Sequence, residues 1–256
     1  MEDFRVRSVL VTGADRGIGL GLVQQFMNLP HPPGLIFATC RHPDGTKGQG
    51  RAPPGAHFTP SSSLGPDVTD TESIRGAAQK VREHLKGRGL NLLINNAGIA
   101  CDTTLDSETA ETMRAVYDTN TVGPMRVSQA FFPLLQTAAL WSSCPRMSCI
   151  KAAIINLSSC FGSLSTLEEW QRKQVVGYRC SKAALNMLTR CQARGYGCWG
   201  ILCISLHPGG VKTGLDAEEE VLSVASSTQA ILQVLARLST SDNGCFLDWR
   251  GQVVPW

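Results

Sequence analysis

Two side chains that can exchange a proton lie four positions apart in the segment VVGYRCSKAAL, residues 175–185, namely Tyr178 and Lys182. The segment is expected to be helical, and residues four apart on a helix project from one face, so both can reach a single bound molecule. A phenol has a pKa of about 10 and is a poor acid or base near neutrality unless a nearby cation stabilises its anion. The spacing therefore predicts acid–base chemistry by Tyr178, with its pKa lowered by Lys182.

A second chemical signal is a glycine-rich loop near the start of the chain. The segment VTGADRGIGLGLVQQF follows a strand-like run and places Gly13, Gly17 and Gly19 in a turn that opens a helix. Glycines there let the backbone approach a pyrophosphate, and the helix N-terminus supplies N–H groups and a favourable dipole. The spacing is GxxxGxG rather than the usual GxGxxG. A flexible strand-to-helix turn therefore stays open as the alternative to dinucleotide binding.

The end of the second strand-like run favours NADP(H) over NAD(H). An acidic residue about 20 positions after the glycine loop holds the ribose hydroxyls in NAD sites. Here the segment reads ATCRHP, with Cys40 and Arg41 in that place. Two guanidiniums, Arg16 and Arg41, would attract a 2′-phosphate. The alternative for each arginine is a solvated cation on a loop.

Strand-like and helix-like segments alternate along the chain. The apolar strand-like runs lie at 7–12, 34–39, 90–95, 152–158, 200–207 and 245–247, and the helical periodicities lie at 17–28, 71–86, 108–138, 176–194 and 226–238. Apolar strands separated by helices are typical of a parallel sheet covered on both faces. We therefore expect an α/β fold, a single Rossmann-type doubly wound parallel sheet with helices on both faces.

Length and composition predict one domain over residues 1–256, because 256 residues with 43% hydrophobic composition can bury one substantial core. A stretch rich in Pro, Gly and Ser, at about 42–67, is expected to be an irregular excursion. The net charge is +3 with scattered basic residues, so no nucleic acid partner is expected.

The same sequence features indicate a compartment. Ten cysteines show no paired CxxC spacing, which favours a reduced intracellular protein without a metal site. The start MEDFRVRSVLVTG shows no signal-peptide or mitochondrial leader pattern, and no apolar run reaches the roughly 18 residues of a membrane helix. A cytoplasmic protein with no membrane partner is expected.

Three motifs together carry a family resemblance. They are Thr12-Gly13-x-x-x-Gly17-x-Gly19 in the first loop, NNAG from Asn95 to Gly98 after the third strand-like run, and Tyr178-x-x-x-Lys182. In this order and at these separations they resemble the short-chain dehydrogenases/reductases, from about Val9 to the C-terminus. Within that family the segments YRCSKAALNM and FLDWRGQVVPW are most similar to the C-factor and sniffer-type carbonyl reductases.

The resemblance implies four catalytic residues. Tyr178 matches the family's catalytic tyrosine, and Lys182 matches the lysine that also binds the nicotinamide ribose. The segment INLSSCFGS supplies a serine, and in an SSxxG motif the second serine is catalytic, which indicates Ser159 rather than Ser158. The segment DTNTVGP supplies Asn120, which in the family holds a water that links the lysine to solvent.

The resemblance also implies a set of residues for NADP(H). Asp67 and Val68 of DVTD would flank the adenine, and residues 208–213 of HPGGVKT would pass the nicotinamide carboxamide. The residues expected to bind the cofactor are Gly13, Asp15, Arg16, Gly17, Ile18, Gly19, Arg41, Asp67, Val68, Asn95, Ala97, Gly98, Tyr178, Lys182, Pro208, Gly209, Val211 and Thr213.

Each of these side chains also has an ordinary structural interpretation. Tyr178 suits a core aromatic, Lys182 a surface lysine and Ser159 a turn at a strand end. Their joint occurrence in family order favours the functional interpretation. Cys160 and Cys180 lie next to this set and are expected to pack rather than react.

Three segments depart from the family pattern. Tyr178 follows Ser159 by 19 positions, with LEEWQRKQ inserted, and this longer loop is expected to rim the substrate pocket near Trp170. The excursion from 43 to 66 replaces a helix and a strand that cover the adenine side in relatives, which would weaken cofactor binding. The acidic segment GLDAEEEVLSVASS after Thr213 is short where relatives have a mobile lid, which predicts an open site.

The leading hypothesis is an NADPH-dependent carbonyl reductase that acts on small aldehydes, ketones or quinones. Tyr178 would donate the proton and Ser159 would hold the carbonyl oxygen. Two alternatives stay open: the same site oxidising a steroid- or retinoid-like alcohol, and a non-catalytic NADP(H)-binding regulatory protein. By resemblance, the helices at 108–138 and 176–194 are expected to form a homodimer interface.

Overall fold

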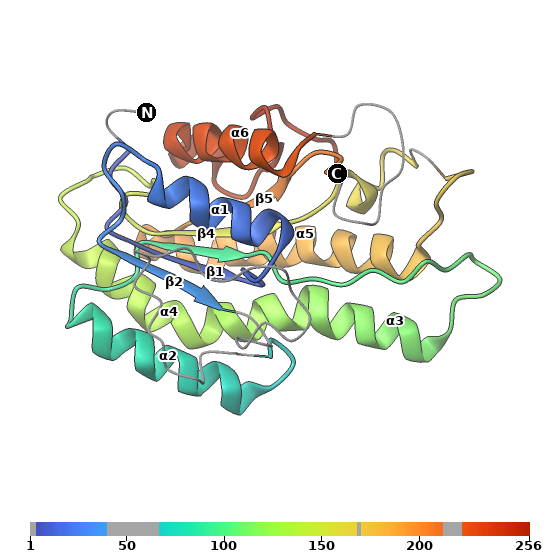
Figure 1. The fold of residues 1–256 in the computed structure, drawn as a ribbon, viewed down its shortest axis with the longest axis horizontal. Helices are drawn as coiled ribbons and strands as arrows, with labels where there is room; N and C mark the ends of the chain where they lie inside the picture. The colour runs from blue at the N-terminus through green and yellow to red at the C-terminus, as the bar shows by residue number, and fades with distance from the viewer. Residues whose placement is uncertain (1–3, 40–66, 168–169, 212–221) are drawn as a thin grey trace.

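A computed structural model describes residues 4–39, 67–167, 170–211 and 222–256 of the chain (Figure 1). The strands are β1 (Ser8–Thr12), β2 (Leu35–Thr39), β3 (Leu92–Asn95), β4 (Ala153–Leu157), β5 (Leu202–His207) and β6 (Phe246–Asp248). The helices are α1 (Gly17–Met27), α2 (Thr71–Leu85), α3 (Ala110–Tyr117), α4 (Gly123–Trp141), α5 (Val176–Tyr196) and α6 (Val224–Arg237). The predicted alternation is confirmed.

The sheet has six strands, all parallel, in the order β2-β1-β3-β4-β5-β6. The chain runs outward from β1 to β2 and then returns to the other side of β1 to place β3. The carboxyl ends of β1 and β3 therefore meet at the point where the strand order reverses. In open α/β sheets this point is where ligands bind.

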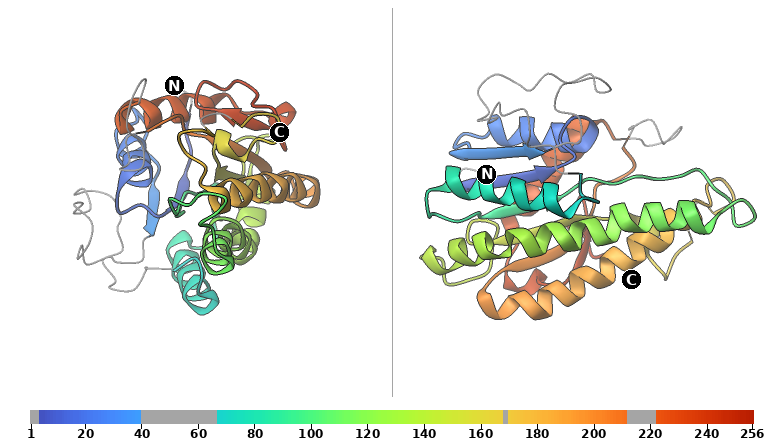
Figure 2. Two further views of the ribbon diagram at one scale, coloured as in Figure 1. Left: turned by 90° about the vertical axis from the view of Figure 1, so that its right-hand side faces the viewer. Right: turned by 90° about the horizontal axis from the view of Figure 1, so that it is seen from below.

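Helices cover both faces of the sheet, as Figure 2 shows in its left-hand view. Side chains alternate along β1, so Val9 and Val11 join an apolar core with α1 and α6 while Leu10 joins a second core with α2 and α4. Val9, Leu10 and Val11 are all fully buried. The predicted doubly wound arrangement, a sheet buried on both faces, is confirmed.

The predicted continuous helix over 108–138 is wrong, because the chain forms α3, a π-helical turn at Asp118–Val122 and then α4. Pro124 supplies the reason, since it has no N–H to donate to the carbonyl of Asn120 and its ring crowds that carbonyl. The wider turn is closed instead by the Gly123 N–H, which donates to the carbonyl of Asp118. This turn carries Asn120, one of the expected catalytic residues.

Several predictions fall outside the described residues. Arg41, Thr213, most of the irregular excursion at 42–67 and most of the acidic segment at 214–227 belong to this group. In the described part of the chain, no helix combines the length and the apolar character needed to cross a membrane.

Candidate active site

Tyr178 and Lys182 lie one turn apart near the start of α5, as the sequence predicts. The Lys182 side chain is 5% exposed, and its Nζ donates a hydrogen bond of 2.7 Å to the carbonyl of Leu157 at the end of β4. Lys182 Nζ also lies 5.5 Å from the centroid of the Tyr178 ring, and Tyr178 is half-buried. Burial lowers the pKa of Lys182 to about 8. A lysine with this pKa is cationic at neutral pH and sits beside the phenol.

The two neighbouring serines after β4 have different surroundings. Ser158 Oγ donates 2.7 Å to Oδ1 of the buried Asn186, so this hydroxyl is engaged in the packing of α5 on the sheet. Ser159 Oγ accepts a hydrogen bond of 3.2 Å from the Phe161 N–H and caps a short 3-10 turn. As an acceptor in that contact, the Ser159 hydroxyl keeps its proton available to donate elsewhere. The structure therefore favours Ser159 over Ser158 as a hydrogen-bond donor to a ligand.

Asn120 is fully buried, and its side chain is fixed by three hydrogen bonds. Oδ1 accepts 2.9 Å from the Ile99 N–H, while Nδ2 donates 2.8 Å to the Ile99 carbonyl and 3.0 Å to Ser181 Oγ. This side chain therefore joins the π turn to the segment after β3 and to α5. π-helical turns inside helices are often found at functional sites.

At two glycines, Gly98 and Gly162, the elements that carry the expected catalytic residues approach one another closely. A Cβ at Gly98 would lie 3.1 Å from Asn120 Oδ1 and 3.8 Å from Lys182 Nζ. A Cβ at Gly162, in the turn that Ser159 caps, would lie 2.7 Å from the backbone carbonyl carbon of Lys182. The elements that carry Asn120, Ser159, Tyr178 and Lys182 thus meet at the carboxyl end of the sheet.

The glycine loop packs directly on the NNAG segment. Gly13 has a φ of +63°, and a Cβ there would lie 2.9 Å from Ala97 Cα. Asn96 Nδ2 donates to the carbonyls of Thr12 and Gly13, at 2.8 and 2.9 Å. Thr12 Oγ1 accepts from the N–H groups of Asn96 and Ala97. Asn96 therefore holds the loop. This role was not among the predictions, although Asn96 lies inside the NNAG motif.

The start of α1 fits a pyrophosphate. Its N-cap is Arg16, which is exposed and makes no side-chain cap hydrogen bond, and the first turn contains no acidic residue. Gly17, with a φ of +53°, begins the helix, and a Cβ at Gly19 would lie 2.2 Å from the Gly13 carbonyl oxygen. Only backbone can occupy this cradle, and the first N–H groups of a helix lack intrahelical partners. Asp15 and Ile18 are half-buried beside it.

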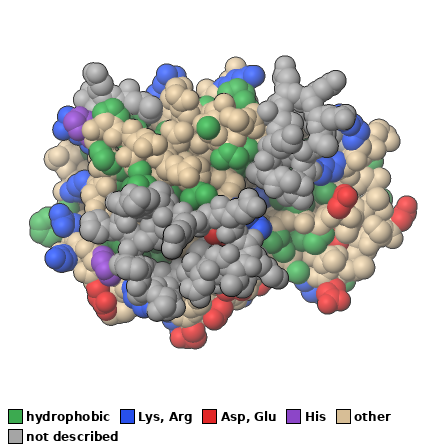
Figure 3. All heavy atoms as spheres, in the orientation of Figure 1, with side chains coloured by type: hydrophobic (Ala, Val, Ile, Leu, Met, Phe, Trp, Pro, Cys, Tyr) green, Lys and Arg blue, Asp and Glu red, His purple; other side chains and the backbone are tan. Residues whose placement is uncertain are grey.

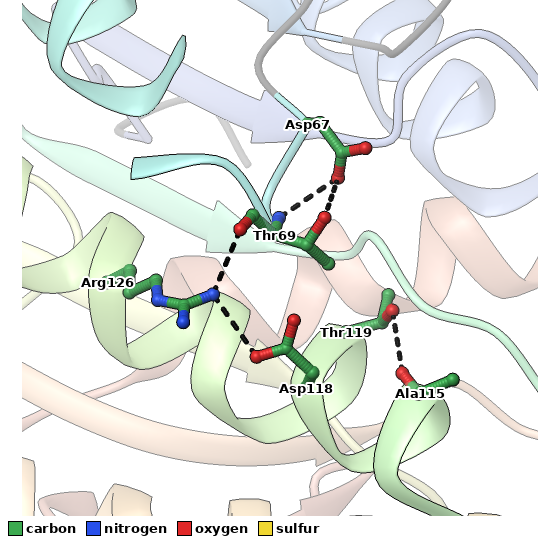
Figure 4. A network of polar contacts seen from close by, with 6 residues as sticks. All are labelled: Asp67, Thr69, Ala115, Asp118, Thr119 and Arg126. Carbon is green, nitrogen blue, oxygen red and sulfur yellow. Dashed lines mark hydrogen bonds and ion pairs between the residues drawn. The ribbon is translucent and has the colours of Figure 1, made fainter. Parts of the chain in front are cut away.

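The turn at Asp67–Thr69 is fixed by the polar contacts shown in Figure 4. Asp67 Oδ1 accepts from the Thr69 N–H at 2.9 Å and from Thr69 Oγ1 at 2.7 Å. Arg126 of α4 donates to the Thr69 carbonyl and forms an ion pair of 3.1 Å with Asp118 of the π turn. Val68 is buried. The expected adenine-side turn is therefore tied to the element that carries Asn120.

Two other expected cofactor residues make polar contacts with neighbouring helices. Asn95 is buried, and its Nδ2 donates to Ser128 Oγ and Asn156 Oδ1, between the sheet and α4. The Pro208 carbonyl accepts 2.6 Å from Ser227 Oγ of α6. The Asn95 amide nitrogen and the Pro208 carbonyl are therefore both engaged within the protein.

Gly209 and Val211 continue the chain after β5. Gly209 has a φ of +87°, and a Cβ there would lie 2.6 Å from Leu222 Cδ1. Val211 forms a β-bridge with Leu222. These contacts bring the start of α6 against the end of β5, on the expected nicotinamide side.

The inserted loop before Tyr178 is anchored by a buried arginine. Arg179 donates to the carbonyls of Gln174 and Lys173, at 2.8 and 3.0 Å. Its guanidinium carbon lies 4.1 Å from the Phe161 ring centroid and 5.7 Å from that of Trp170. Arg179 therefore ties the loop both to α5 and to the turn after Ser159. This role could not be predicted from the sequence, because the partners of Arg179 are set by the fold and not by spacing.

A carboxylate also holds the start of α5. Glu108 Oε2 accepts 2.8 Å from the Gly177 N–H and 2.6 Å from Thr103 Oγ1. Hydrogen bonds from Thr103 and Thr112 lower the pKa of Glu108. The residue that Glu108 contacts, Gly177, directly precedes Tyr178, although 69 positions separate Glu108 from Gly177 in the sequence. Across the described ranges, no group of three or more His, Cys, Asp or Glu could hold a metal ion.

Comparison with known proteins identifies the class that this fold and this site define. The family model for short chain dehydrogenases matches residues 7–221, so the chain belongs to that family. The resemblance predicted from the three motifs is confirmed.

Two solved structures are similar over nearly the whole chain. The NADPH-bound carbonyl reductase from chicken fatty liver is 50% identical, with a TM-score of 0.90, and covers 99% of this chain and 100% of its own. The carbonyl reductase Sniffer of Drosophila melanogaster is 32% identical, with a TM-score of 0.87, over 98% of this chain and 100% of its own.

Curated relatives are more distant. C-signal of Myxococcus xanthus is 31% identical over 170 residues, 65% of this chain and 93% of its own length. Mouse estradiol 17-beta-dehydrogenase 2 is 29% identical over 223 residues, 84% of this chain, but the match spans only 51% of that relative.

Proposed function

We propose that the protein is an NADPH-dependent carbonyl reductase acting on small aldehydes, ketones or quinones. The observation that carries the proposal is that the elements bearing Asn120, Ser159, Tyr178 and Lys182 meet at the carboxyl end of the sheet. Lys182 Nζ at 5.5 Å from the Tyr178 ring supplies the cation that such a proton donor requires. The likeness to the chicken and Drosophila carbonyl reductases supports the same reaction class.

NADP(H) is the proposed cofactor, and the residues present fit it. The uncapped start of α1, with Gly13, Gly17 and Gly19, would hold the pyrophosphate, and exposed Arg16 would meet the 2′-phosphate. Arg41 is proposed as a second phosphate contact on sequence alone. The bound NADPH of the chicken enzyme supports this choice over NAD(H).

The chain's own residues would manage the oxygen of the substrate. When bound, NADPH supplies the hydride that a carbonyl carbon receives, and charge then develops on the carbonyl oxygen. Ser159 would donate a hydrogen bond to that oxygen, and Tyr178 would give it a proton. The cationic Lys182 stabilises the phenolate left behind. Asn120 holds the segment after β3 and α5 at the spacing that this requires.

Oxidation of a steroid- or retinoid-like alcohol by the same site is the second candidate. It is favoured by two exposed apolar side chains on the loop after Ser159, Leu164 and Leu167, which are 82% and 63% exposed. The match to half of the mouse estradiol dehydrogenase points the same way. A non-catalytic NADP(H)-binding regulatory role is the third possibility, and separate measurements of binding and turnover distinguish it.

The experiment is NADPH consumption over a panel of aldehydes, ketones and quinones, with a steroid alcohol and NADP⁺ assayed in the reverse direction. We expect turnover with at least one carbonyl class, and a loss of about 100-fold or more in Tyr178→Phe. Both proteins should bind NADPH, as judged by a rise in melting temperature. Equal turnover by the variant would overturn the proposal. Tight binding with no turnover by the wild type would favour the regulatory role.

We also propose one domain that acts as a cytoplasmic homodimer. Apolar side chains are exposed on α4 and α5, with Trp141 75% and Met187 64% exposed. Light scattering of the purified protein tests this proposal, and a monomer at micromolar concentration would contradict it.

A further inference from the structure

A pocket of about 340 Å³ opens at the amino-terminal end of the sheet, opposite the candidate active site. Its walls come from three places, residues 5–8 leading into β1, residues 31–35 leading into β2, and residues 85–91 between α2 and β3. The length of β1, five residues or roughly 17 Å, separates this pocket from the glycine loop. A ligand here would therefore not occupy the cofactor cradle.

The side chains around the pocket carry one sign of charge. Arg5, Arg7 and Arg88 line it and are exposed, His31 lines it as well, and no Asp or Glu is among the described residues that line it. The ion pairs between described residues join other side chains, Arg75 with Glu72 and Arg126 with Asp118. Figure 3 shows basic side chains gathered along the left-hand edge, where the strands of Figure 1 begin. Three guanidiniums that line one pocket, with no carboxylate from the described part of its wall, attract an anion.

Two of the basic groups are already held in place. Arg5 Nη2 lies 3.2 Å from His31 Nε2, and because a guanidinium has only donors, the imidazole accepts through that nitrogen. This contact joins the β1 wall of the pocket to the β2 wall. Arg5 is therefore already engaged, and Arg7 and Arg88 are the guanidiniums of the pocket that are left to meet an anion.

The other residues that line the pocket indicate that the anion also has an apolar part. Pro32 and Leu35 give the pocket apolar surface that is not fully buried. The polar groups at its floor are engaged with the protein: Ser8 Oγ donates to the Gly89 carbonyl and to Asn91 Oδ1, and Asn91 Nδ2 donates to two backbone carbonyls. Polar recognition is thus left to the basic side chains, while the walls suit an apolar body.

We propose that this pocket binds a small amphiphilic anion, an acyl or aryl chain that ends in a carboxylate. The carboxylate lies between Arg7 and Arg88, which can each offer a bidentate pair of donors, and the chain lies against Pro32 and Leu35. This site is independent of the proposed carbonyl reduction.

The test is a calorimetric titration of the full chain with octanoate in saturating NADPH. Octanoate should bind at one site with a dissociation constant on the order of 1 mM or below. Arg7→Gln/Arg88→Gln should weaken binding at least about tenfold, whereas Arg75→Gln, which removes another exposed charge outside the pocket, should leave it unchanged. All variants should melt near the wild-type temperature, since these side chains are on the surface.

Four results would overturn the proposal. Equal binding of the neutral octanamide would remove the role of the arginines, and equal binding of inorganic phosphate would remove the role of the apolar walls. An equal loss in Arg75→Gln would show a general effect of protein charge. Octanoate binding that survives intact in the double variant would place the ligand elsewhere, including the substrate site.

Discussion

At the scale of single residues, the two serines after β4 are expected to have different roles, Ser158 in stability and Ser159 in catalysis. Ser158→Ala removes a donor from the buried Asn186 and should cost about 1–2 kcal/mol of unfolding free energy with little change in kcat. Ser159→Ala should lower kcat by about 100-fold, because it removes a donor to the developing oxyanion, and should cost less stability than Ser158→Ala, since it loses only the longer contact from the Phe161 N–H. Chemical denaturation and steady-state kinetics on both variants test this assignment. The opposite pattern would make Ser158 the catalytic serine.

Lys182 provides a test of burial in the protein without cofactor. Its pKa of about 8 lies below the ordinary value of 10.5, so the unfolded state binds more protons between these values. Stability contributed by this group therefore rises with pH across about 8 to 10.5, by at most roughly 3 kcal/mol. Lys182→Met should lack this rise.

The measurement is the difference in unfolding free energy between the wild type and Lys182→Met, taken from pH 7 to pH 10.5. The difference cancels the titration of other groups. A constant difference over this range would mean that Lys182 is not buried as a titrating cation.

The residue roles that sequence could predict were those encoded by local spacing. Tyr178 and Lys182 share a helix face, so four-residue spacing was enough to pair them. Asn96 lies next to Asn95 in one motif, yet the two side chains diverge, one to the glycine loop and one into the sheet. Strand alternation predicts that divergence but does not say which side chain holds the loop.

At the scale of elements, the start of α5 depends on Glu108. The residue before the helix, Val175, is buried with a φ of +39°, which is an unfavourable conformation for a β-branched side chain. The Glu108 carboxylate accepts the Gly177 N–H and adds negative charge where the helix dipole favours it. These contacts fix the position of Tyr178.

Glu108→Gln should therefore change the acid stability of the protein. The folded pKa of Glu108 is below its usual value of 4.5, so its contribution is present above that pH and is lost as the pH falls through the folded value. The wild type should lose more stability than Glu108→Gln between pH 5 and pH 3. Glu111→Gln, at an exposed site in the first turn of α3, is the control. Parallel curves for wild type and Glu108→Gln would contradict the assignment.

Sequence could predict the elements but not the π turn between α3 and α4. Helical periodicity continues through 108–138, because a single wide turn shifts the pattern by only one residue. Pro124 was the available signal, since a proline inside a helix leaves the carbonyl four residues earlier without its donor. That carbonyl belongs to Asn120, so the irregularity falls on an expected catalytic residue.

At the scale of the whole molecule, the sheet separates two ends with different chemistry. The carboxyl ends of the strands carry the glycine loop and the four proposed catalytic residues. The amino ends carry the basic pocket lined by Arg5, Arg7 and Arg88. The site at the carboxyl ends could be predicted from the sequence because its motifs are local. The pocket at the amino ends could not, because it is formed by three segments that only the fold brings together. Its arginines have no common spacing.

The central claim is that Tyr178 completes hydride transfer from NADPH to a carbonyl carbon. The most direct measurement uses NADPH deuterated at the transferred position and follows the label into the alcohol product by mass spectrometry or NMR. We expect one deuterium on the former carbonyl carbon with wild-type protein, and a label transfer rate at least about 100-fold lower with Tyr178→Phe. NADPH consumed without label in the alcohol, or equal labelling rates for the two proteins, would contradict it.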